Sequence, residues 1–152
     1  MRRIAFFPGS FDPISKGHED IVRRALPMFD EIVVALGVNT SKNYMFTFEQ
    51  RLKWIEKTFA DCATVKVVNY LGLTVDACKE HKANFILRGL RNSNDYEYEK
   101  SIAMMNQAMA PGIETIYLNT RPEWAAISST IIRDIIKNQG NSEAFLASGV
   151  QL

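Results

Sequence analysis

The sequence predicts one α/β domain of Rossmann-like type over residues 1–152, with a five-stranded parallel sheet and helices on both faces. Strand-like and helix-like segments alternate along the whole chain, which is the pattern of repeated β-α units. The strand-like segments are apolar throughout, which is typical of parallel strands that are covered on both faces. No repeat, low-complexity segment or linker divides the chain, so we expect a single domain.

The strands are expected where apolar residues form short runs rich in Val, Ile and Phe. These runs cover residues 4–7, 31–38, 65–68, 84–87 and 114–118. A helix is expected after each run. The first helix is expected to begin near residues 17–18, the second at 47 and the fifth at 128. The third is expected over residues 74–82 and the fourth over 94–108.

Local signals support several of these helices. Ile21, Val22 and Ala25 recur at helical spacing and are expected to face the core. Thr47 and Gln50 have the spacing of a capping box, which marks the start of a helix. We interpret the methionines of the chain as core residues. The fourth helix carries its apolar residues at Tyr98, Ile102, Met105 and Met109.

The amino-acid composition limits the kinds of molecule that the protein is expected to bind. The net charge of +1, with 47% hydrophobic and 23% charged residues, is ordinary for a globular protein and excludes a broad polyanion-binding surface. We therefore expect no nucleic-acid partner, whereas small nucleotides fit this charge balance. No apolar run approaches 18 residues and no signal-peptide pattern is present, so we expect no membrane partner and a cytoplasmic location.

The cysteines and histidines do not predict a metal site. Cys62 and Cys78 form no C-x-x-C motif, and His18 and His81 are the only histidines. This set argues against zinc and is consistent with free thiols in a reducing compartment.

The loop after the first strand is the strongest functional signal. It contains Gly9, Ser10 and Gly17, and His18 falls on the first turn of the following helix. Backbone N–H groups and the helix dipole at such a position favour an anion, so the loop predicts a phosphate site. The dipole lowers the pKa of an imidazole, whereas bound phosphate raises it. We interpret His18 as a hydrogen-bond donor to that phosphate rather than as a helix-start residue without a ligand.

Basic residues follow two other strands, and in a parallel sheet ligands bind at the carboxyl ends of the strands. Lys42 lies in the loop after the second strand and could supply a point charge to a phosphate, although an isolated loop lysine is usually only solvated. Arg88, Gly89 and Arg91 follow the fourth strand and could grip a phosphate. The alternative is a pair of surface arginines that form ion pairs with the acids at 95 and 97.

Two helix starts allow both a structural and a functional interpretation. Glu99 follows an acidic cluster that could simply complement the helix dipole, or its carboxylate could bind a ribose hydroxyl. The hydroxyls of residues 128–130 could serve as helix caps, or the same helix start could hold the outer phosphates of a triphosphate. Trp124 could pack on a base or fill a gap in the core.

Taken together, several motifs resemble the phosphopantetheine adenylyltransferases, within the nucleotidyltransferase superfamily. The Gly-His loop alone marks the superfamily, whereas R-G-L-R followed by E-Y-E is more specific, and the likeness covers nearly the whole chain. The matching stretches are Pro8-Gly9-Ser10-Phe11-Asp12-Pro13-Ile14, Gly17-His18, Ser41-Lys42, Met45-Phe46-Thr47, Arg88-Gly89-Leu90-Arg91, Tyr96-Glu97-Tyr98-Glu99 and Ile127-Ser128-Ser129-Thr130.

The resemblance implies transfer of the adenylyl group of ATP to 4′-phosphopantetheine, which gives dephospho-coenzyme A and pyrophosphate. It implies Mg²⁺ carried mainly by the ATP phosphates, with no protein metal ligands, and a homohexamer. The residues implied around 4′-phosphopantetheine are Ser10, Lys42, Thr74 and Arg88. Those implied around ATP are Gly9, Ser10, His18, Gly89, Leu90, Arg91, Glu99, Trp124, Ala125, Ala126, Ile127, Ser128, Ser129 and Thr130.

We expect direct in-line attack on the α-phosphorus, because no Ser-His or Cys-His pairing indicates a covalent intermediate. His18, Lys42 and Arg91 are the candidate catalytic residues, with His18 stabilising the charge of the transition state. Two alternatives stay open. One is a sister nucleotidyltransferase that acts on nicotinate mononucleotide, or on glycerol phosphate with CTP. The other is a nucleotide-binding module without turnover.

Overall fold

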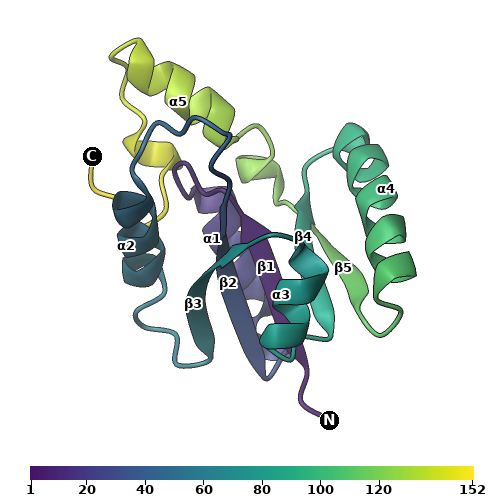
Figure 1. The fold of residues 1–152 in the computed structure, drawn as a ribbon. Helices are drawn as coiled ribbons and strands as arrows, with labels where there is room; N and C mark the ends of the chain where they lie inside the picture. Colours follow the sequence, from purple (N-terminus) through teal and green to yellow (C-terminus); the bar gives the residue numbers. More distant parts are fainter.

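The computed structural model describes all residues 1–152, and its centre is a five-stranded parallel sheet of order β3-β2-β1-β4-β5 (Figure 1). The strands are β1 (Ile4–Gly9), β2 (Glu31–Val38), β3 (Val65–Leu71), β4 (Phe85–Leu90) and β5 (Glu114–Asn119). The helices are α1 (Lys16–Ala25), α2 (Phe48–Thr58), α3 (Thr74–Glu80), α4 (Ser93–Met109) and α5 (Ser129–Lys137). Short 3₁₀ turns are η1 (Leu26–Met28), η2 (Pro122–Trp124) and η3 (Glu143–Phe145). The predicted fold class is confirmed.

Three strands run further than their apolar residues indicated. The ladder of β1 continues to Gly9, that of β3 to Leu71 and that of β4 to Leu90. Backbone pairing with the neighbouring strand sustains these extensions, and it does not depend on an apolar side chain. The extensions carry Gly9 and Arg88 to the edge of the sheet where ligands bind in such folds.

Alternate residues of the strands point into two separate cores, because successive side chains of a strand face opposite sides of the sheet. Phe7 and Val34 pack with α1 and α2, whereas Phe6 and Val33 pack with α3. Ile21, Val22 and Ala25 are buried in the first core, as predicted. The predicted capping box of α2 is also present.

The interpretation of the methionines as core residues is wrong for α4. Met105 is 63% exposed and Tyr98 is 71% exposed, and Met104 and Met109 are exposed as well. The helix turns a small and polar side toward the sheet edge instead, and Glu99 is its only buried residue. The apolar residues do recur on one side of the helix, but that side is exposed and does not pack in the core.

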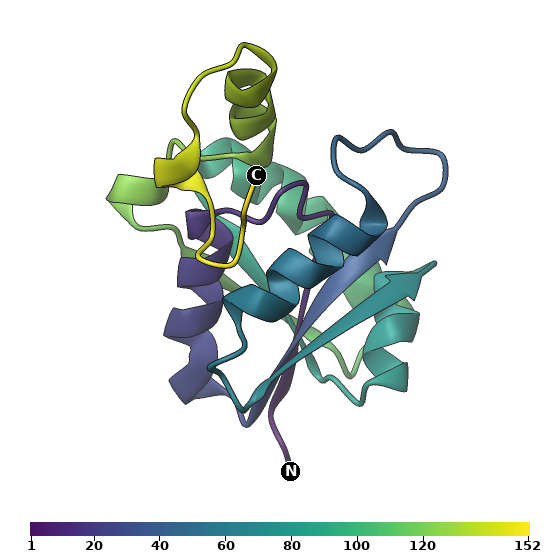
Figure 2. The same ribbon diagram turned by 90° about the vertical axis from the view of Figure 1, so that its left-hand side faces the viewer.

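Strands β1 and β4 diverge toward their carboxyl ends, at the point where the order of the strands in the sheet reverses. β1 pairs with β4 only at Ala5↔Phe85 and Phe6↔Ile86, whereas its pairing with β2 continues to Gly9. This point of reversed strand order is where a crevice opens in doubly wound sheets. Helix α5 lies beyond the carboxyl ends of the strands in both views (Figures 1 and 2). No helix of the chain has the length and apolar character needed to cross a bilayer.

Candidate active site

Two adjoining cavities open at this edge of the sheet. The larger has a volume of about 550 Å³ and the smaller about 340 Å³. The smaller cavity is lined by the first loop and by the starts of α1 and α5, and the larger by the ends of β2 and β3 and by α4. Six residues line both cavities and therefore mark their junction. They are Pro8, Gly9, Ser10, Lys42, Arg88 and Glu99.

His18 lies in the smaller cavity, and a capping box fixes its ring. Ser15 is the N-cap of α1, and its hydroxyl accepts from the His18 N–H at 3.3 Å. In return, Nδ1 of His18 accepts from the Ser15 N–H at 3.0 Å. In a neutral imidazole with an accepting Nδ1, the proton is on Nε2. The ring therefore keeps an N–H donor for a ligand.

The surroundings of His18 keep it neutral. Burial is the main cause, and the nearby positive charges of Arg88 and Arg91 add to it, which lowers the pKa of His18 from 6.5 to about 4. The ring also packs edge-on against Phe11, with 5.1 Å between the ring centroids. At neutral pH His18 is thus a neutral hydrogen-bond donor in a positively charged setting.

The hydroxyl of Ser15 lies 3.1 Å from Nδ1 of His18, so the site contains one close Ser-His contact. Ser15 is 2% exposed, however, and its hydroxyl is engaged with the start of the helix. It lacks the access that a nucleophile needs. The pair is a helix cap, and it gives no support to a covalent intermediate.

Gly9 allows the first loop to fold tightly. A Cβ atom at Gly9 would lie 2.8 Å from Cζ of Phe11, so any larger residue would displace this ring. Phe11 itself has a positive φ of 46°. Because Phe11 packs against His18, the glycine and the histidine of the motif are linked through one aromatic ring.

Arg88 spans the gap between β1 and β4 at the junction of the cavities. Its guanidinium donates to the Pro8 carbonyl at 2.6 Å and to both carboxylate oxygens of Glu99, at 3.0 and 2.6 Å. Glu99 is buried, whereas the side chain of Arg88 is 31% exposed to the cavities. The guanidinium group of Arg88 is thereby held in one orientation at the edge of both cavities.

Arg91 forms one of the surface ion pairs that the sequence allowed as an alternative to phosphate binding. Its side chain pairs with Asp95, at 3.1 and 3.2 Å, and its backbone N–H donates to the same carboxylate. Arg88 instead pairs with Glu99, and neither arginine forms an ion pair with Glu97. Arg91 still lines the smaller cavity with His18.

Lys42 and Ser10 meet across the junction. Nζ of Lys42 donates to the Ser10 hydroxyl at 3.3 Å, although the two residues are 32 positions apart in the sequence. Lys42 is exposed, whereas Ser10 is half-buried at the end of β1. A cation and a hydroxyl are thus brought together where the two cavities join.

The start of α5 closes the smaller cavity on the side opposite the sheet. Ser128 is its N-cap and accepts from the N–H of Ile131 at 3.2 Å, so the capping interpretation is correct for this hydroxyl. Ser129 and Thr130 follow it in the lining. Both helix starts, at His18 and at Ser129, therefore face one cavity, as the sequence predicted.

The carbonyl groups of the first loop are held by donors from distant parts of the chain. Arg133 donates to the Asp12 carbonyl at 2.9 Å, and the Ser129 hydroxyl donates to that of Pro13 at 2.8 Å. The N–H of Ala147 donates to the Ile14 carbonyl at 3.3 Å. These contacts occupy the carbonyl oxygens with donors, so the loop leaves fewer free acceptors that would repel an anion.

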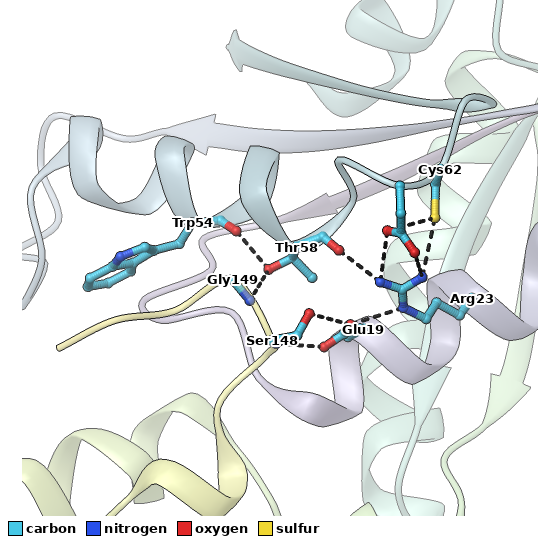
Figure 3. A network of polar contacts seen from close by, with 8 residues as sticks. Glu19, Arg23, Trp54, Thr58, Cys62, Ser148 and Gly149 are labelled. Atoms are coloured by element: carbon cyan, nitrogen blue, oxygen red, sulfur yellow. Dashed lines mark hydrogen bonds and ion pairs between the residues drawn. The ribbon is translucent and has the colours of Figure 1, made fainter.

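The segment after α5 runs back over the start of α1 (Figure 3). Ser148 donates from its N–H and its hydroxyl to the carboxylate of Glu19, both at 2.8 Å. Glu19 in turn pairs with Arg23, and Gly149 donates to the Thr58 hydroxyl at 3.1 Å. The end of the chain is thus tied to both α1 and α2, close to the turn that carries His18.

The structure brings most of the implied ATP residues together. Leu90 and residues 124–126 (Trp124, Ala125 and Ala126) do not line either cavity, and Trp124 instead lies under Nζ of Lys16, 5.3 Å from the ring centroid. Their role in binding stays a prediction. The residues that line the smaller cavity are Gly9, Ser10, His18, Gly89, Arg91, Glu99, Ile127, Ser128, Ser129 and Thr130.

All four residues implied for 4′-phosphopantetheine line the larger cavity, namely Ser10, Lys42, Thr74 and Arg88. The hydroxyl of Thr74 lies 3.1 Å from that of Tyr70. Sequence reasoning missed Tyr70, which lines the same cavity. Its place near the end of β3, four positions before a predicted binding residue, was the signal available.

Sequence reasoning also missed the residues that hold the loops. Asp12 accepts from the N–H groups of Met45 and Phe46, at 2.9 and 3.0 Å, and so ties the first loop to the segment after Lys42. Arg51 and Arg133 bind loop carbonyls. No local pattern distinguishes these arginines from solvated ones.

The site can bind phosphate groups, but it does not form a metal cage. Its donors are N–H groups, hydroxyls, arginines and a neutral histidine, and no cluster of three or more potential metal ligands is present. The three acids that line it, Asp12, Asp95 and Glu99, are each paired with an arginine. This donor set and the fold define a nucleotidyltransferase.

Comparison with known proteins agrees with this class. Residues 6–135 match the cytidylyltransferase-like family. A bifunctional NMN adenylyltransferase/ADP ribose pyrophosphatase from Francisella tularensis, complexed with AMP and a manganese ion, has the same fold, with a TM-score of 0.71 at 22% identity over 97% of this chain and 45% of that one. A putative nicotinate-nucleotide adenylyltransferase from Vibrio parahaemolyticus has a TM-score of 0.68 at 18% identity, over 96% and 94% of the two chains.

Sequence relatives define the family more narrowly. A phosphopantetheine adenylyltransferase from Flavobacterium johnsoniae is 51% identical over 150 residues, which cover 99% of this chain and 98% of the relative. One from Phocaeicola vulgatus is 46% identical over 152 residues, which cover 100% and 99%. The chain belongs to the phosphopantetheine adenylyltransferase family.

Proposed function

We propose that residues 1–152 form one adenylyltransferase domain in which a phosphate oxygen of 4′-phosphopantetheine attacks the α-phosphorus of ATP in line. The new oxygen–phosphorus bond forms as the bond to the β-phosphate bridge breaks, which gives dephospho-coenzyme A and pyrophosphate. The observation that carries this proposal is the pair of cavities that meet at Ser10, Lys42 and Arg88. Two anionic substrates need such a junction, because their mutual repulsion must be cancelled where they react.

In this proposal the smaller cavity takes ATP. The starts of α1 and α5 face each other across it, and both present N–H groups and a positive dipole end to the triphosphate. The Nε2–H group of His18 donates to the α-phosphoryl oxygen and stabilises the charge that develops in the transition state. Because the ring is neutral, it stabilises this charge as a donor and does not transfer a proton.

The larger cavity takes 4′-phosphopantetheine. Ser10 and Lys42 orient its phosphate at the junction, and Arg88 presents a fixed fork to the same group. Arg91 lies on the ATP side, where its positive charge helps to offset the negative charge of the phosphates. Thr74 lies further out, where the rest of the acceptor extends along α4.

Mg²⁺ arrives with ATP in this proposal and supplies charge neutralisation on the phosphates. The protein offers no carboxylate cage for it, since Asp95 and Glu99 are paired with arginines. The residues described above therefore bind the phosphates and leave the metal to the nucleotide.

We also propose that the protein acts as a homohexamer in the cytoplasm. The exposed apolar side of α4, formed by Tyr98, Met104, Met105 and Met109, is the surface that supports self-association. Cys62 and Cys78 are free, which suits a reducing compartment.

The deciding experiment is a pyrophosphate-release assay with ATP or CTP and each of three acceptors. We expect release only with ATP and 4′-phosphopantetheine, together with formation of dephospho-coenzyme A. Release with nicotinate mononucleotide, or with CTP and glycerol phosphate, would instead assign a sister reaction. Binding of ATP without release from any pair would indicate a module without turnover.

A further inference from the structure

Arg51 is a buried cation without an acidic partner. It lies on the first turn of α2, is 3% exposed, and takes part in none of the ion pairs of the molecule. Burial of an unpaired charge is costly, so such a residue is retained only where other groups stabilise it. Its contacts lead directly to the active site.

The guanidinium of Arg51 joins two loops. It donates to the Ser10 carbonyl at 2.8 Å and to the Phe46 carbonyl at 3.2 Å. Ser10 directly follows β1, and Phe46 lies near the end of the loop that contains Lys42. The planar guanidinium group of Arg51 thus fixes the distance between the two segments that form the junction of the cavities.

A second contact extends from Arg51 toward Lys42. The guanidinium lies over the ring of Tyr44, with its carbon 3.8 Å from the centroid. Nζ of Lys42 lies over the same ring at 5.6 Å. Both cations therefore lie over one ring, and Tyr44 connects Arg51 to Lys42.

We propose that Arg51 is a positioning residue for the acceptor phosphate, acting by holding Ser10 and Lys42 at the distance that one phosphate group spans. Arg51 lines neither cavity, so it does not touch the substrate itself. By binding the Ser10 carbonyl it also turns that oxygen away from the junction, where it would repel an anion. This inference rests on the proposed function. It adds Arg51 as a residue that acts on the acceptor phosphate through Ser10 and Lys42.

Steady-state kinetics of Arg51→Lys and Arg51→Met tests the proposal. Lysine keeps the charge but cannot bind both carbonyls as a fork, and methionine keeps only the bulk. We expect the KM for 4′-phosphopantetheine to rise about tenfold or more in both, the change typical of losing a charge-assisted hydrogen bond, while the KM for ATP changes by less than about twofold. Lys53→Met is the matched control, since it removes an exposed charge from the same helix.

An acceptor KM within about twofold of the wild-type value would overturn the proposal, and so would an equal rise in both KM values. Thermal unfolding is measured in parallel, and an Arg51→Lys protein that is unfolded without ligand would assign Arg51 to folding instead. If the wild type itself shows no turnover, the proposed function fails. The role of Arg51 is then measured from the affinity for inorganic phosphate by calorimetry, which must fall in Arg51→Lys but not in Lys53→Met.

Discussion

Nδ1 of His18 accepts a hydrogen bond from the backbone N–H of Ser15 at 3.0 Å, and this contact determines which ring nitrogen faces the ligand. The backbone donor is present whatever residue occupies position 15. Histidine here takes the place that glutamate or glutamine holds in an ordinary capping box. One nitrogen of the imidazole therefore binds the start of the helix, and the other is the proposed donor to the substrate.

Replacement of His18 by alanine is expected to lower kcat about 10²–10³-fold, the loss typical of removing one donor to a transition-state oxyanion. Ser15→Ala removes the capping hydroxyl but keeps the N–H that fixes the ring. It should cost about 1 kcal/mol of stability and leave most of the activity. The pyrophosphate-release assay and thermal unfolding measure the two effects. Near-normal turnover in folded His18→Ala would remove His18 from the mechanism.

The protonation of His18 predicts a pH dependence of stability. The folded protein lowers the pKa of His18 to about 4 from 6.5, so the unfolded chain takes up this proton first as the pH falls. The contribution to the free energy of unfolding is full above pH 6.5 and declines toward pH 4, with a slope of up to about 1.4 kcal/mol per pH unit.

His18→Gln should flatten this decline, as followed by urea unfolding at several pH values. In histidine-labelled protein, NMR should show a neutral ring protonated on Nε2 down to about pH 5. A ring that is charged at pH 6 in the free protein would contradict the assignment.

Glu99 is expected to act through Arg88, since both of its oxygens are bound by that guanidinium. Glu99→Gln should raise the KM for 4′-phosphopantetheine about tenfold, because a neutral amide holds the fork weakly. The ratio of kcat/KM for ATP to that for 2′- or 3′-deoxy-ATP should not change. A drop of that ratio toward one in the variant would instead assign Glu99 to a ribose hydroxyl.

Gly149 lies directly against α2, which leaves no room for a side chain. A Cβ atom there would lie 2.4 Å from the backbone nitrogen of Thr58. Gly149→Ala should therefore destabilise the protein by about 1–3 kcal/mol. Gly112→Ala is the control, because its Cβ would meet no atom within 4 Å. Thermal unfolding compares the two, and equal midpoints would contradict the close packing.

The exposed side of α4 predicts self-association. Met105→Glu places a charge at its centre and should reduce the mass measured by light scattering from that of a hexamer to a smaller species. Met28→Glu changes an exposed methionine elsewhere and should leave the mass unaltered. A wild-type protein that is monomeric at micromolar concentration would contradict the proposed assembly.

Much of the fold follows from local patterns in the sequence. The apolar runs located all five strands, and the capping box located the start of α2, because both depend on residues close together in the chain. The clustering of the candidate phosphate-binding residues was also predictable, since the carboxyl ends of parallel strands meet at one edge. Hydrophobicity alone does not state whether an apolar helix side meets the sheet or another protein, which is why Met105 was misplaced.

The partners of the charged residues were not predictable. Arg88 lies 11 positions from Glu99 and 80 from Pro8, and the strand-to-helix geometry alone determines that these groups meet. Arg51 carries no sign of burial in its neighbours along the chain. Ser15 and His18 are the exception, because a hydroxyl three positions before a helical histidine is a pattern that the sequence contains.

The carbonyls of the first loop have a consequence for synthesis of the protein on the ribosome. The Ile14 carbonyl is bound by Ala147, so the loop is completed by residues that are translated long after it. A nascent chain that has formed its sheet still lacks donors for this loop until α5 and the segment after it emerge. Nucleotide affinity should therefore arise late during translation, and a ribosome-stalled chain that ends before Ser129 should not retain ATP.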